Sequence, residues 1–330
     1  MIHLLTTGGT IASTPGTSGR NVAGALPAEA LLDAIDAGLD AGPAVHTESL
    51  LQKPSNAING EDLCRIAERC ETRLADPSTD GIVITHGTDT LEDTAWFLQQ
   101  VLGDCPRPVV VTGSQRALHE RGSDAPRNLV DALRVAAATG SRGQGVLVVF
   151  DEAIHSASLV RKISSYRLTG FGSPGYGPVG HIDGTILRYP LNARIPTPIP
   201  RGPTLPRVDI VPAAAGSACP IDALRGDGAQ GLIIDALGRG QVPPDWVPTI
   251  ARAHAAGCPV AITSSTGSGP VAEVYEYPGS LERVIAAGAV GADALSARQA
   301  RLLLMLVLST PEGAADWRAR FATAAGWSTV

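Results

Sequence analysis

The fold of this chain is indicated most directly by residues 81–102, which read GIVITHGTDTLEDTAWFLQQVL. The first four residues, Gly81–Ile84, form a short continuous apolar run, which is typical of a strand buried on both faces. A polar turn follows, and Leu91–Leu102 then has the length and composition of a helix. We therefore predict a strand, a turn and a helix in succession, the repeating unit of a parallel sheet covered by helices.

The same alternation of apolar runs and helical patterns extends through the first half of the chain. The other expected strands are residues 2–5, 109–111 and 146–150, and the other expected helices lie near residues 27–37, 61–74 and 126–138. Strands that are apolar throughout and separated by helices favour a doubly wound, mostly parallel α/β sheet.

A proline-rich stretch follows this first region. Residues 190–207 contain prolines at positions 190, 196, 198, 200, 203 and 206, too many for a helix or a central strand to continue. We predict an N-terminal α/β domain over residues 1–189, a linker over 190–207 and a smaller C-terminal α/β domain over 208–330. Ser296 and Gln299 have the spacing of a capping box, which predicts a helix that runs through Leu308.

Composition and charge exclude several classes of protein. The net charge of -6 is not that of a basic nucleic-acid-binding domain. No apolar run reaches the roughly 18 residues of a membrane span, and the residues after Met1 lack the pattern of an export signal. The five cysteines have no CxxC spacing, which favours reduced thiols over a disulfide framework or a zinc site. We expect a cytoplasmic protein with no cofactor, no metal, and no nucleic-acid or membrane partner.

The first candidate for chemistry is the turn after the first strand, Thr6–Ser13, which reads TTGGTIAS. Ligands of open α/β sheets bind outside the carboxyl ends of the strands, where this turn is expected. Two glycines allow a tight bend, and Thr10 adds a hydroxyl that can attack a carbonyl carbon. A nucleotide-binding turn or a plain strand-to-helix corner is the alternative, although the spacing of this turn is not GxGxxG and the chain contains no GxxxxGK[ST].

A second polar turn follows the strand at residues 81–84. It holds His86, Thr88, Asp89 and Thr90. Asp89 and Thr90 would also serve as N-cap residues of the next helix. That function does not account for the other hydroxyls, whereas a site for a zwitterionic amino acid needs both carboxylate and hydroxyl groups.

Lys162 is the third candidate. It lies among apolar residues after the strand at residues 146–150 and the Asp151–Glu152 turn. A lysine in apolar surroundings can lose its proton and serve as a base. Taken alone, its sequence context favours an exposed charge over a base, so its weight comes from the combination with the two turns.

These residues resemble the bacterial-type L-asparaginases, which are related to the glutaminase-asparaginases. Thr7–Ala12 and Thr85–Thr90 look like the two signature motifs of that family, in the correct order. The similarity continues through residues 113–116 and 123–129, Lys162 and residues 299–304, and so covers nearly the whole chain. The resemblance implies a hydrolase that converts L-asparagine to L-aspartate and ammonia, and that acts on L-glutamine as a secondary substrate.

The resemblance also implies roles for individual residues. Thr10 matches the usual candidate nucleophile, which forms an acyl-enzyme, and Thr88, Asp89 and Lys162 match a second polar triad; which threonine attacks is disputed for the family, and we predict Thr10. Besides Thr88 and Asp89, the substrate-binding positions are Gly9, Ser55 and Asn56, where many members have glutamine in place of Asn56. Asp89 is expected to hold the substrate ammonium group.

The chain departs from the family in the loop after the first motif. Many members carry a tyrosine there, but no tyrosine precedes Tyr166 in this chain. Glycines and small polar residues favour a closing lid in this segment, with a plain flexible connection as the alternative. Arg20 and Asn21 are the candidates to replace the tyrosine.

In the second domain, the resemblance implies that Glu273 matches an acid that reaches the site of the neighbouring subunit. A homodimer or homotetramer is therefore expected. The alternatives are an ammonia-supplying amidotransferase subunit, which would carry an extra N-terminal domain not expected here, and a non-catalytic amino-acid-binding protein on the same scaffold.

Overall fold

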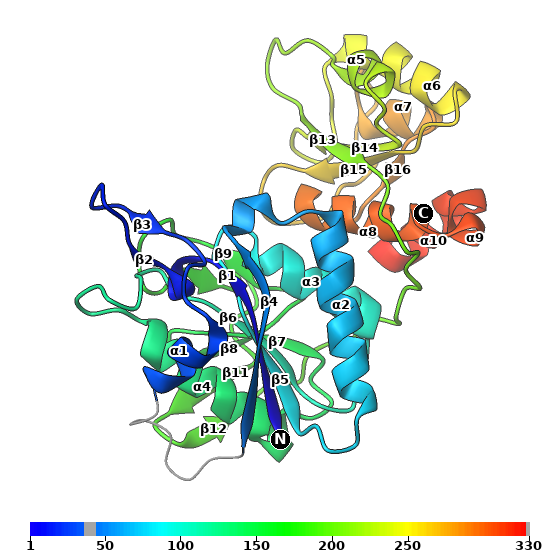
Figure 1. The fold of residues 1–330 in the computed structure, drawn as a ribbon. Coiled ribbons are helices and arrows are strands. Elements are labelled where there is room, and N and C mark those ends of the chain that lie inside the picture. The colour runs from blue at the N-terminus through cyan, green and yellow to red at the C-terminus, as the bar shows by residue number, and fades with distance from the viewer. Residues whose placement is uncertain (36–43, 328–330) are drawn as a thin grey trace. The chain divides into compact units, whose positions relative to one another are not determined.

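The computed structural model describes residues 1–35 and 44–327. The chain divides into two compact units, Met1–Pro198 and Ile199–Val330 (Figure 1). Residues 189–207, the proline-rich stretch with the residue before it, contain neither helix nor strand. The division falls within this stretch, whereas the finer boundaries at residues 189 and 208 stay a prediction.

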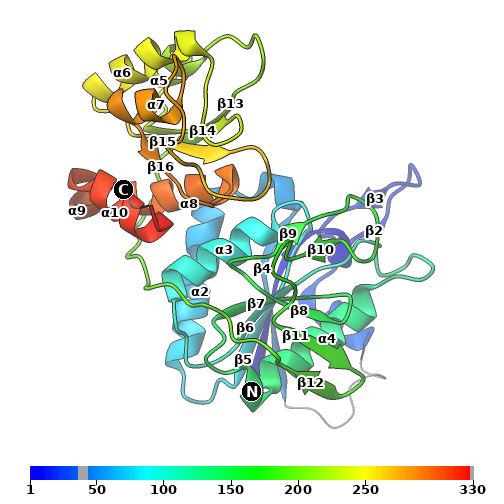
Figure 2. The same cartoon turned by 180° about the vertical axis from the view of Figure 1, so that it is seen from behind.

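The first unit is built on one eight-stranded sheet, in the order β12-β11-β8-β7-β6-β5-β1-β4 (Figure 2). Its strands are β1 (Ile2–Gly8), β4 (Val45–Lys53), β5 (Gly81–Thr85), β6 (Val109–Thr112), β7 (Val146–Phe150), β8 (Ala153–Ser156), β11 (Gly180–Asp183) and β12 (Ile186–Arg188). The pairings from β4 through β7 are parallel, and those from β7 through β12 are antiparallel. The predicted α/β fold is confirmed, and the sheet is mixed, with the antiparallel strands gathered at one end.

Helices cover both faces of this sheet. The helices α2 (Gly60–Ala75) and α3 (Leu91–Leu102) lie on one face, and α1 (Ala28–Asp33) and α4 (Ala125–Ala137) lie on the other (Figure 1). The central strands are buried throughout because the side chains on each face of the sheet pack against a layer of helices. The helix expected near residues 27–37 ends earlier in the structure, and positions 36 and 37 lie outside the described residues.

The strands of this sheet that the sequence pattern missed are β4 at one edge and the antiparallel strands β8, β11 and β12 at the other end. The edge strand β4 is largely polar and half-buried, so it lacks the apolar run that marks the central strands. The strands β7 and β8 are joined by a two-residue turn, Asp151–Glu152, in which both residues have positive φ, 50° and 62°. This is the geometry of a type I′ hairpin, but its usual Asn-Gly or Asp-Gly sequence is absent.

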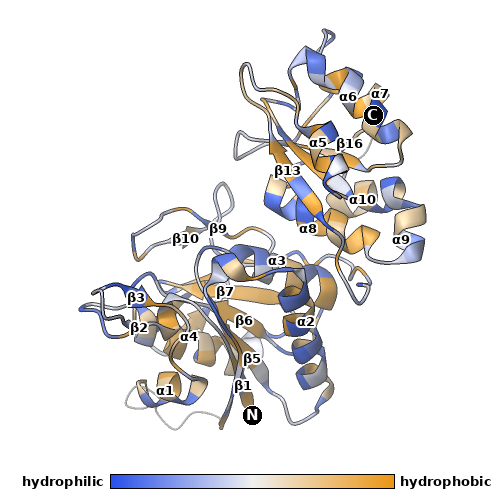
Figure 3. Ribbon diagram, turned by 45° about the horizontal axis from the view of Figure 1, so that its top comes forward, coloured by the Kyte–Doolittle hydropathy of each residue, from blue (hydrophilic) through white to orange (hydrophobic). Residues whose placement is uncertain are grey.

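The second unit contains a four-stranded parallel sheet in the order β13-β14-β15-β16. Its strands are β13 (Val208–Pro212), β14 (Gly231–Ala236), β15 (Val260–Ser264) and β16 (Val290–Gly291), and its helices are α5 (Ile221–Gly226), α6 (Val247–Ala255), α7 (Leu281–Ala286), α8 (Ala297–Leu308), α9 (Pro311–Ala315) and α10 (Trp317–Ala325). Figure 3 shows apolar strands at the centre of this unit, as it does for the first. The predicted capping box is confirmed, because the Ser296 hydroxyl accepts the Gln299 N–H at the start of α8.

Other expectations concern what the chain contains. Among residues 1–35 and 44–327, no helix has the length and apolar character that crossing a bilayer requires. Within the same residues, no cluster of three or more His, Cys, Asp or Glu side chains is arranged to hold a metal ion. The five cysteines form no disulfide, and four of them are buried.

Candidate active site

The first turn of the site follows β1 and is held by main-chain contacts. Gly8 and Gly9 both have positive φ, 105° and 81°, a conformation that favours glycine. The Gly9 N–H donates to the Lys53 carbonyl at 3.2 Å, and the Gly9 carbonyl accepts the Gly24 N–H at 3.3 Å. A short 3-10 helix, Thr10–Ala12, begins directly after this bend, so the position of Thr10 is set by the glycines that precede it.

The second turn joins β5 to α3 and touches the first turn through its backbone. A Cβ atom added to Gly9 would lie only 2.2 Å from the Gly87 Cα. Such an approach is possible only between residues without side chains. Since Thr10 and Thr88 each follow one of these glycines, the contact brings the two signature turns together at the carboxyl edge of the sheet.

Lys162 comes to the second turn from a different part of the chain. It lies in β9 (Arg161–Lys162), which pairs with β10 (Phe171–Gly172). Its ammonium nitrogen, Nζ, donates to Thr88 Oγ1 at 2.8 Å and to Asp89 Oδ1 at 2.7 Å. The Lys162 side chain is 17% exposed and that of Asp89 is 68% exposed. Thr88, Asp89 and Lys162 therefore form one cluster, which the lysine bridges.

Ser55 packs against the second turn and forms hydrogen bonds with it. It begins a short 3-10 helix, Ser55–Ala57, and is buried. Its hydroxyl accepts the Asp89 N–H at 3.3 Å, and its carbonyl accepts the Thr90 hydroxyl at 2.8 Å. A Cβ atom on Gly87 would lie 2.7 Å from the Ser55 hydroxyl oxygen, so this segment is also packed against a glycine. Asn56, the next residue, is exposed.

The environments of the two threonine hydroxyls differ. Thr88 is buried and its oxygen accepts from Lys162. Thr10 is half-buried, and its hydroxyl has no hydrogen-bond partner within residues 1–35 and 44–327. The Thr10 hydroxyl is therefore open to attack a ligand, whereas the Thr88 hydroxyl is held by the lysine and can stabilise a developing charge or pass on a proton.

The lid candidates lie in a small hairpin after the first turn. The strands β2 (Thr14–Pro15) and β3 (Asn21–Val22) pair antiparallel, and the Gly16 N–H donates to the Arg20 carbonyl at 2.8 Å. Both Arg20 and Asn21 are exposed. The Asn21 amide donates to Glu120 at 2.6 Å, so its side chain contacts the β6–α4 loop. Replacement of the missing tyrosine by either residue stays a prediction.

His86 is part of the packing beneath the second turn. Complete burial lowers its pKa from 6.5 to about 4, so the imidazole is neutral near pH 7. The Gly87 carbonyl, which can only accept, lies 2.8 Å from Nδ1, and this assigns the ring proton to Nδ1. Nε2 then accepts the Thr94 hydroxyl at 2.9 Å. The histidine thereby joins the turn to α3.

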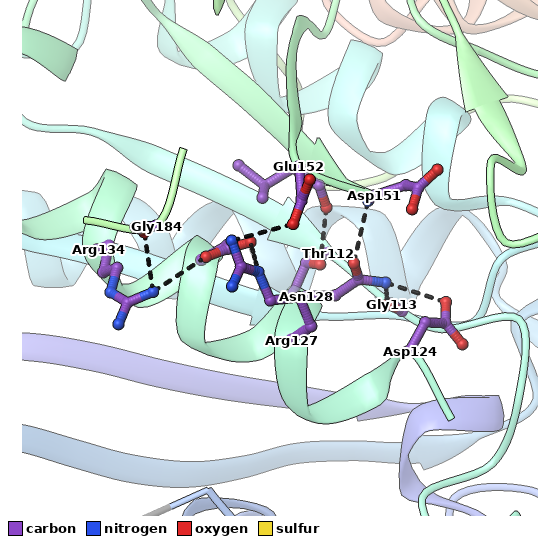
Figure 4. Close-up of polar contacts among 11 residues, drawn as sticks. Thr112, Gly113, Asp124, Arg127, Asn128, Arg134, Asp151, Glu152 and Gly184 are labelled. Carbon is purple, nitrogen blue, oxygen red and sulfur yellow. Dashed lines mark hydrogen bonds and ion pairs between the residues drawn. The ribbon is translucent and has the colours of Figure 1, made fainter. Parts of the chain in front are cut away.

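A polar network behind the site centres on Asn128 of α4 (Figure 4). Its amide nitrogen donates to the Gly113 carbonyl at 2.9 Å and to Asp124 at 3.0 Å. Its amide oxygen accepts the Asp151 N–H at 3.0 Å, in the turn between β7 and β8. Asn128 therefore connects the end of β6, the start of α4 and the hairpin turn.

The other residue of that turn, Glu152, is also connected to α4. Arg127 contacts both Asp131, at 2.7 Å, and Glu152, at 3.2 Å (Figure 4). Burial raises the pKa of the Asp131 carboxyl, although the adjacent Arg127 and Arg134 oppose this shift. Sequence reasoning assigned no role to these residues; Asn128 and Arg127 lie in the segment 123–129 that resembles the family, and that was their only signal.

Glu273 belongs to the second unit. It is exposed, in the segment between β15 and α7 that has neither helix nor strand. Its approach to the site of a neighbouring subunit stays a prediction.

Together, the fold and the site define a two-unit α/β protein with a threonine–aspartate–lysine cluster where parallel strands of its larger sheet end. The sequence matches "Asparaginase, N-terminal" over residues 1–193 and "Glutaminase/Asparaginase C-terminal domain" over residues 207–321. The chain therefore belongs to the asparaginase family.

Individual relatives match along nearly their whole length. The chain is 37% identical to the L-asparaginase of Bacillus licheniformis, with 96% of this chain and 98% of that protein covered. It is 39% identical to a probable L-asparaginase of Deinococcus radiodurans, with 97% and 96% covered. A crystal structure of a probable cytoplasmic L-asparaginase from Campylobacter jejuni matches with a TM-score of 0.83 at 27% identity, covering 97% of this chain and 98% of that one.

Proposed function

We propose that this protein is an amidohydrolase that converts L-asparagine to L-aspartate and ammonia. The names of its full-length relatives support this substrate. The observation that carries the proposal is the Lys162 ammonium, which bridges Thr88 and Asp89 beside the contact between Gly9 and Gly87. A buried hydroxyl held by a lysine, next to a second hydroxyl on a glycine bend, is suited to acyl transfer.

In the proposed reaction, the Thr10 oxygen attacks the side-chain carbonyl carbon of asparagine. The C–N bond breaks, the leaving nitrogen takes up the proton that the Thr10 hydroxyl gives up and departs as ammonia, and an ester between Thr10 and the aspartyl group remains. Water then attacks the ester, which releases L-aspartate and restores the Thr10 hydroxyl. No cofactor is needed for either step.

Thr88 and Lys162 act on protons and charge in this scheme. A hydroxyl has one proton to donate, and the Thr88 oxygen is already an acceptor for Lys162. Its own proton is therefore directed to another group, such as the developing oxyanion or the attacking water. Donors of this kind contribute roughly 3–4 kcal/mol to transition-state stabilisation.

Recognition of the amino-acid part is assigned to Asp89, Ser55, Asn56 and the Gly9 backbone. The exposed carboxylate of Asp89 suits the substrate ammonium group. The Ser55 hydroxyl, which accepts the Asp89 N–H at 3.3 Å, suits the substrate carboxylate.

The proposal is tested by measuring ammonia release from L-asparagine and L-glutamine with the purified protein. We expect turnover of both, with the larger kcat/KM for asparagine. D-asparagine is the matched control, because it presents the same amide with the ammonium and carboxylate exchanged. Absence of ammonia from both L-amides would refute the enzymatic function.

We also propose a cytoplasmic homo-oligomer in which Glu273 completes the site of a second subunit. The Campylobacter jejuni protein named as cytoplasmic supports the compartment. Mixing inactive Thr10→Ala chains with inactive Glu273→Ala chains would restore activity if the two residues act from different subunits. Sedimentation of the wild type as an active monomer would refute the assembly.

A further inference from the structure

Glu92 is a buried acid that the proposed reaction does not use. It lies in the first turn of α3, four residues after Thr88, and its side chain is only 8% exposed. Its carboxylate oxygen, Oε2, accepts a hydrogen bond from the main-chain N–H of Lys162. The helix that follows the Thr88 turn is therefore connected directly to the strand that carries the lysine.

The direction of the Lys162 N–H explains why its hydrogen-bond acceptor lies outside the β9–β10 pair. Across the β9–β10 pair, the next amide, Ile163 N–H, donates to the Gly170 carbonyl at 2.8 Å. Successive amides of an extended strand point to opposite edges, so the Lys162 N–H faces away from β10. The ladder supplies no acceptor on that side, and Glu92 supplies one.

Two further contacts hold the loop after Lys162, but they act at a distance from the lysine. The Gln115 side-chain amide donates to the Ser164 carbonyl at 3.1 Å, and the Thr169 hydroxyl donates to Asp151. These contacts restrain the loop body. Only the Glu92 contact, among these three, fixes the backbone of Lys162 itself.

We propose that Glu92 is a positioning residue that sets the Lys162 ammonium against Thr88 and Asp89. A lysine side chain is long and has many conformers, so a backbone held in one place favours the conformer in which its ammonium group bonds to both partners, at 2.8 and 2.7 Å. The catalytic consequence rests on the proposed function, whereas the placement of Lys162 does not.

Two substitutions of Glu92 distinguish the length of its side chain from its charge as the property that holds Lys162. Glu92→Gln keeps the length of the side chain and an acceptor oxygen but removes the charge. Glu92→Asp keeps the charge but withdraws the carboxylate by one methylene. We expect Glu92→Gln to keep kcat within about threefold of the wild type and Glu92→Asp to lower kcat roughly 10- to 100-fold, because small misplacements of a catalytic group have effects of this size. KM should change less than kcat in both variants, since Glu92 acts through Lys162.

Glu92→Ala, which removes the acceptor altogether, should behave as Glu92→Asp does, and it takes the place of that variant if the aspartate protein does not fold. Thermal unfolding of each variant checks the fold. Equal loss of kcat in Glu92→Gln and Glu92→Asp, or full activity in Glu92→Asp and Glu92→Ala, would overturn the proposal.

Crystal structures of the variants give a readout that does not depend on turnover. In Glu92→Asp, the Lys162 Nζ should move beyond about 3.5 Å from Thr88 Oγ1, outside hydrogen-bond range. In Glu92→Gln it should stay bonded. An unmoved lysine in Glu92→Asp would refute the positioning role even if the wild type hydrolysed no amide, whereas a displaced lysine in an enzyme without asparaginase activity would refute only the proposed function.

Discussion

The Thr10 turn and the Thr88 turn end neighbouring strands of one sheet, yet they are built differently. The Thr10 turn is shaped by two glycines and main-chain hydrogen bonds, and its hydroxyl has no partner within the described residues 1–35 and 44–327. The Thr88 turn is held by side chains, with His86 beneath it and Lys162 on its hydroxyl. The Thr10 turn therefore leaves its hydroxyl open to a ligand, whereas the Thr88 turn holds its hydroxyl in a hydrogen bond.

This difference separates the two threonines by chemical role. A hydroxyl whose oxygen is not held by another group is open to a ligand, and it gives its proton to a base when it attacks a carbonyl carbon. A hydroxyl that accepts from an ammonium group is oriented and keeps its proton for a neighbour. The comparison supports Thr10 as nucleophile and Thr88 as donor or proton relay, and each prediction below is a way to break or sharpen that division.

The largest effect is expected from Thr10→Ala. Removal of the nucleophile should lower kcat by at least about 10³-fold while L-aspartate still binds. Steady-state kinetics and calorimetry measure the two quantities. Thr72→Ala, an exposed threonine on α2, is the control. Mass spectrometry of rapidly quenched reactions should find the aspartyl ester on the peptide that contains Thr10; an ester on Thr88 would reverse the assignment.

The next largest effect is expected from Lys162→Met. Loss of the group that holds Thr88 should lower kcat roughly 10²- to 10³-fold, within the range of general acid–base contributions. Arg65→Met removes an exposed cation from α2 and should leave kcat unchanged. If Lys162→Met retained full activity, the hydrogen bond from Lys162 to Thr88 would not contribute to catalysis.

The contact between the two turns is tested by Gly9→Ala. A new Cβ would clash with Gly87, and its backbone conformation is unfavourable for alanine, so we expect the free energy of unfolding to fall by about 2–4 kcal/mol. Gly19→Ala is the matched control, because Gly19 has a φ of +75° but no atom within 4 Å of the added Cβ. That variant should lose only about 1–2 kcal/mol, from conformation alone. Urea unfolding distinguishes the two, and equal losses would argue against close packing of the turns.

Acid should destabilise the folded protein through His86, which is buried beside the second turn. The pKa of His86 is lowered to about 4 in the folded protein from 6.5, so the unfolded chain binds the additional proton between these values. Stability therefore falls as pH decreases from 6.5 towards 4, by up to about 1.4 kcal/mol per pH unit for this group.

The pKa of His155 is also lowered to about 4 and contributes with the same sign. The share of His86 is obtained from the difference between the wild type and His86→Gln, measured by urea unfolding at several pH values. A pH dependence that is identical in the two proteins would show that His86 does not carry this linkage.

The smallest effect is expected in the hairpin after Thr10. Asn21→Ala removes one exposed hydrogen bond to Glu120 and should cost about 0.5–1 kcal/mol or less. If neither residue replaces the missing tyrosine, kcat/KM stays within about threefold of the wild type for Asn21→Ala and Arg20→Ala, which corresponds to the free energy of about one such hydrogen bond. A large fall in kcat for either variant would instead assign that residue the role of the missing tyrosine.

The sequence was informative where local chemistry and periodicity act alone. The strands β5 and β7 and the helix α3 lie at the predicted residues, because apolar runs and helical patterns are local properties. The edge strand β4 and the antiparallel hairpins were missed, since half-buried edges and a type I′ turn without glycine leave no clear pattern.

For the site, the sequence by itself determined that two threonine turns follow strands whose carboxyl ends meet at one edge. Only the tertiary structure decided which groups touch: Lys162 is 74 residues from Thr88 in the chain and bonds to it, and Glu92, which no motif singled out, holds the Lys162 backbone. The reason is physical. Strands and glycine bends are determined by residues that are close in the sequence. The partner of a side chain depends on how distant segments pack, which is a property of the folded chain as a whole.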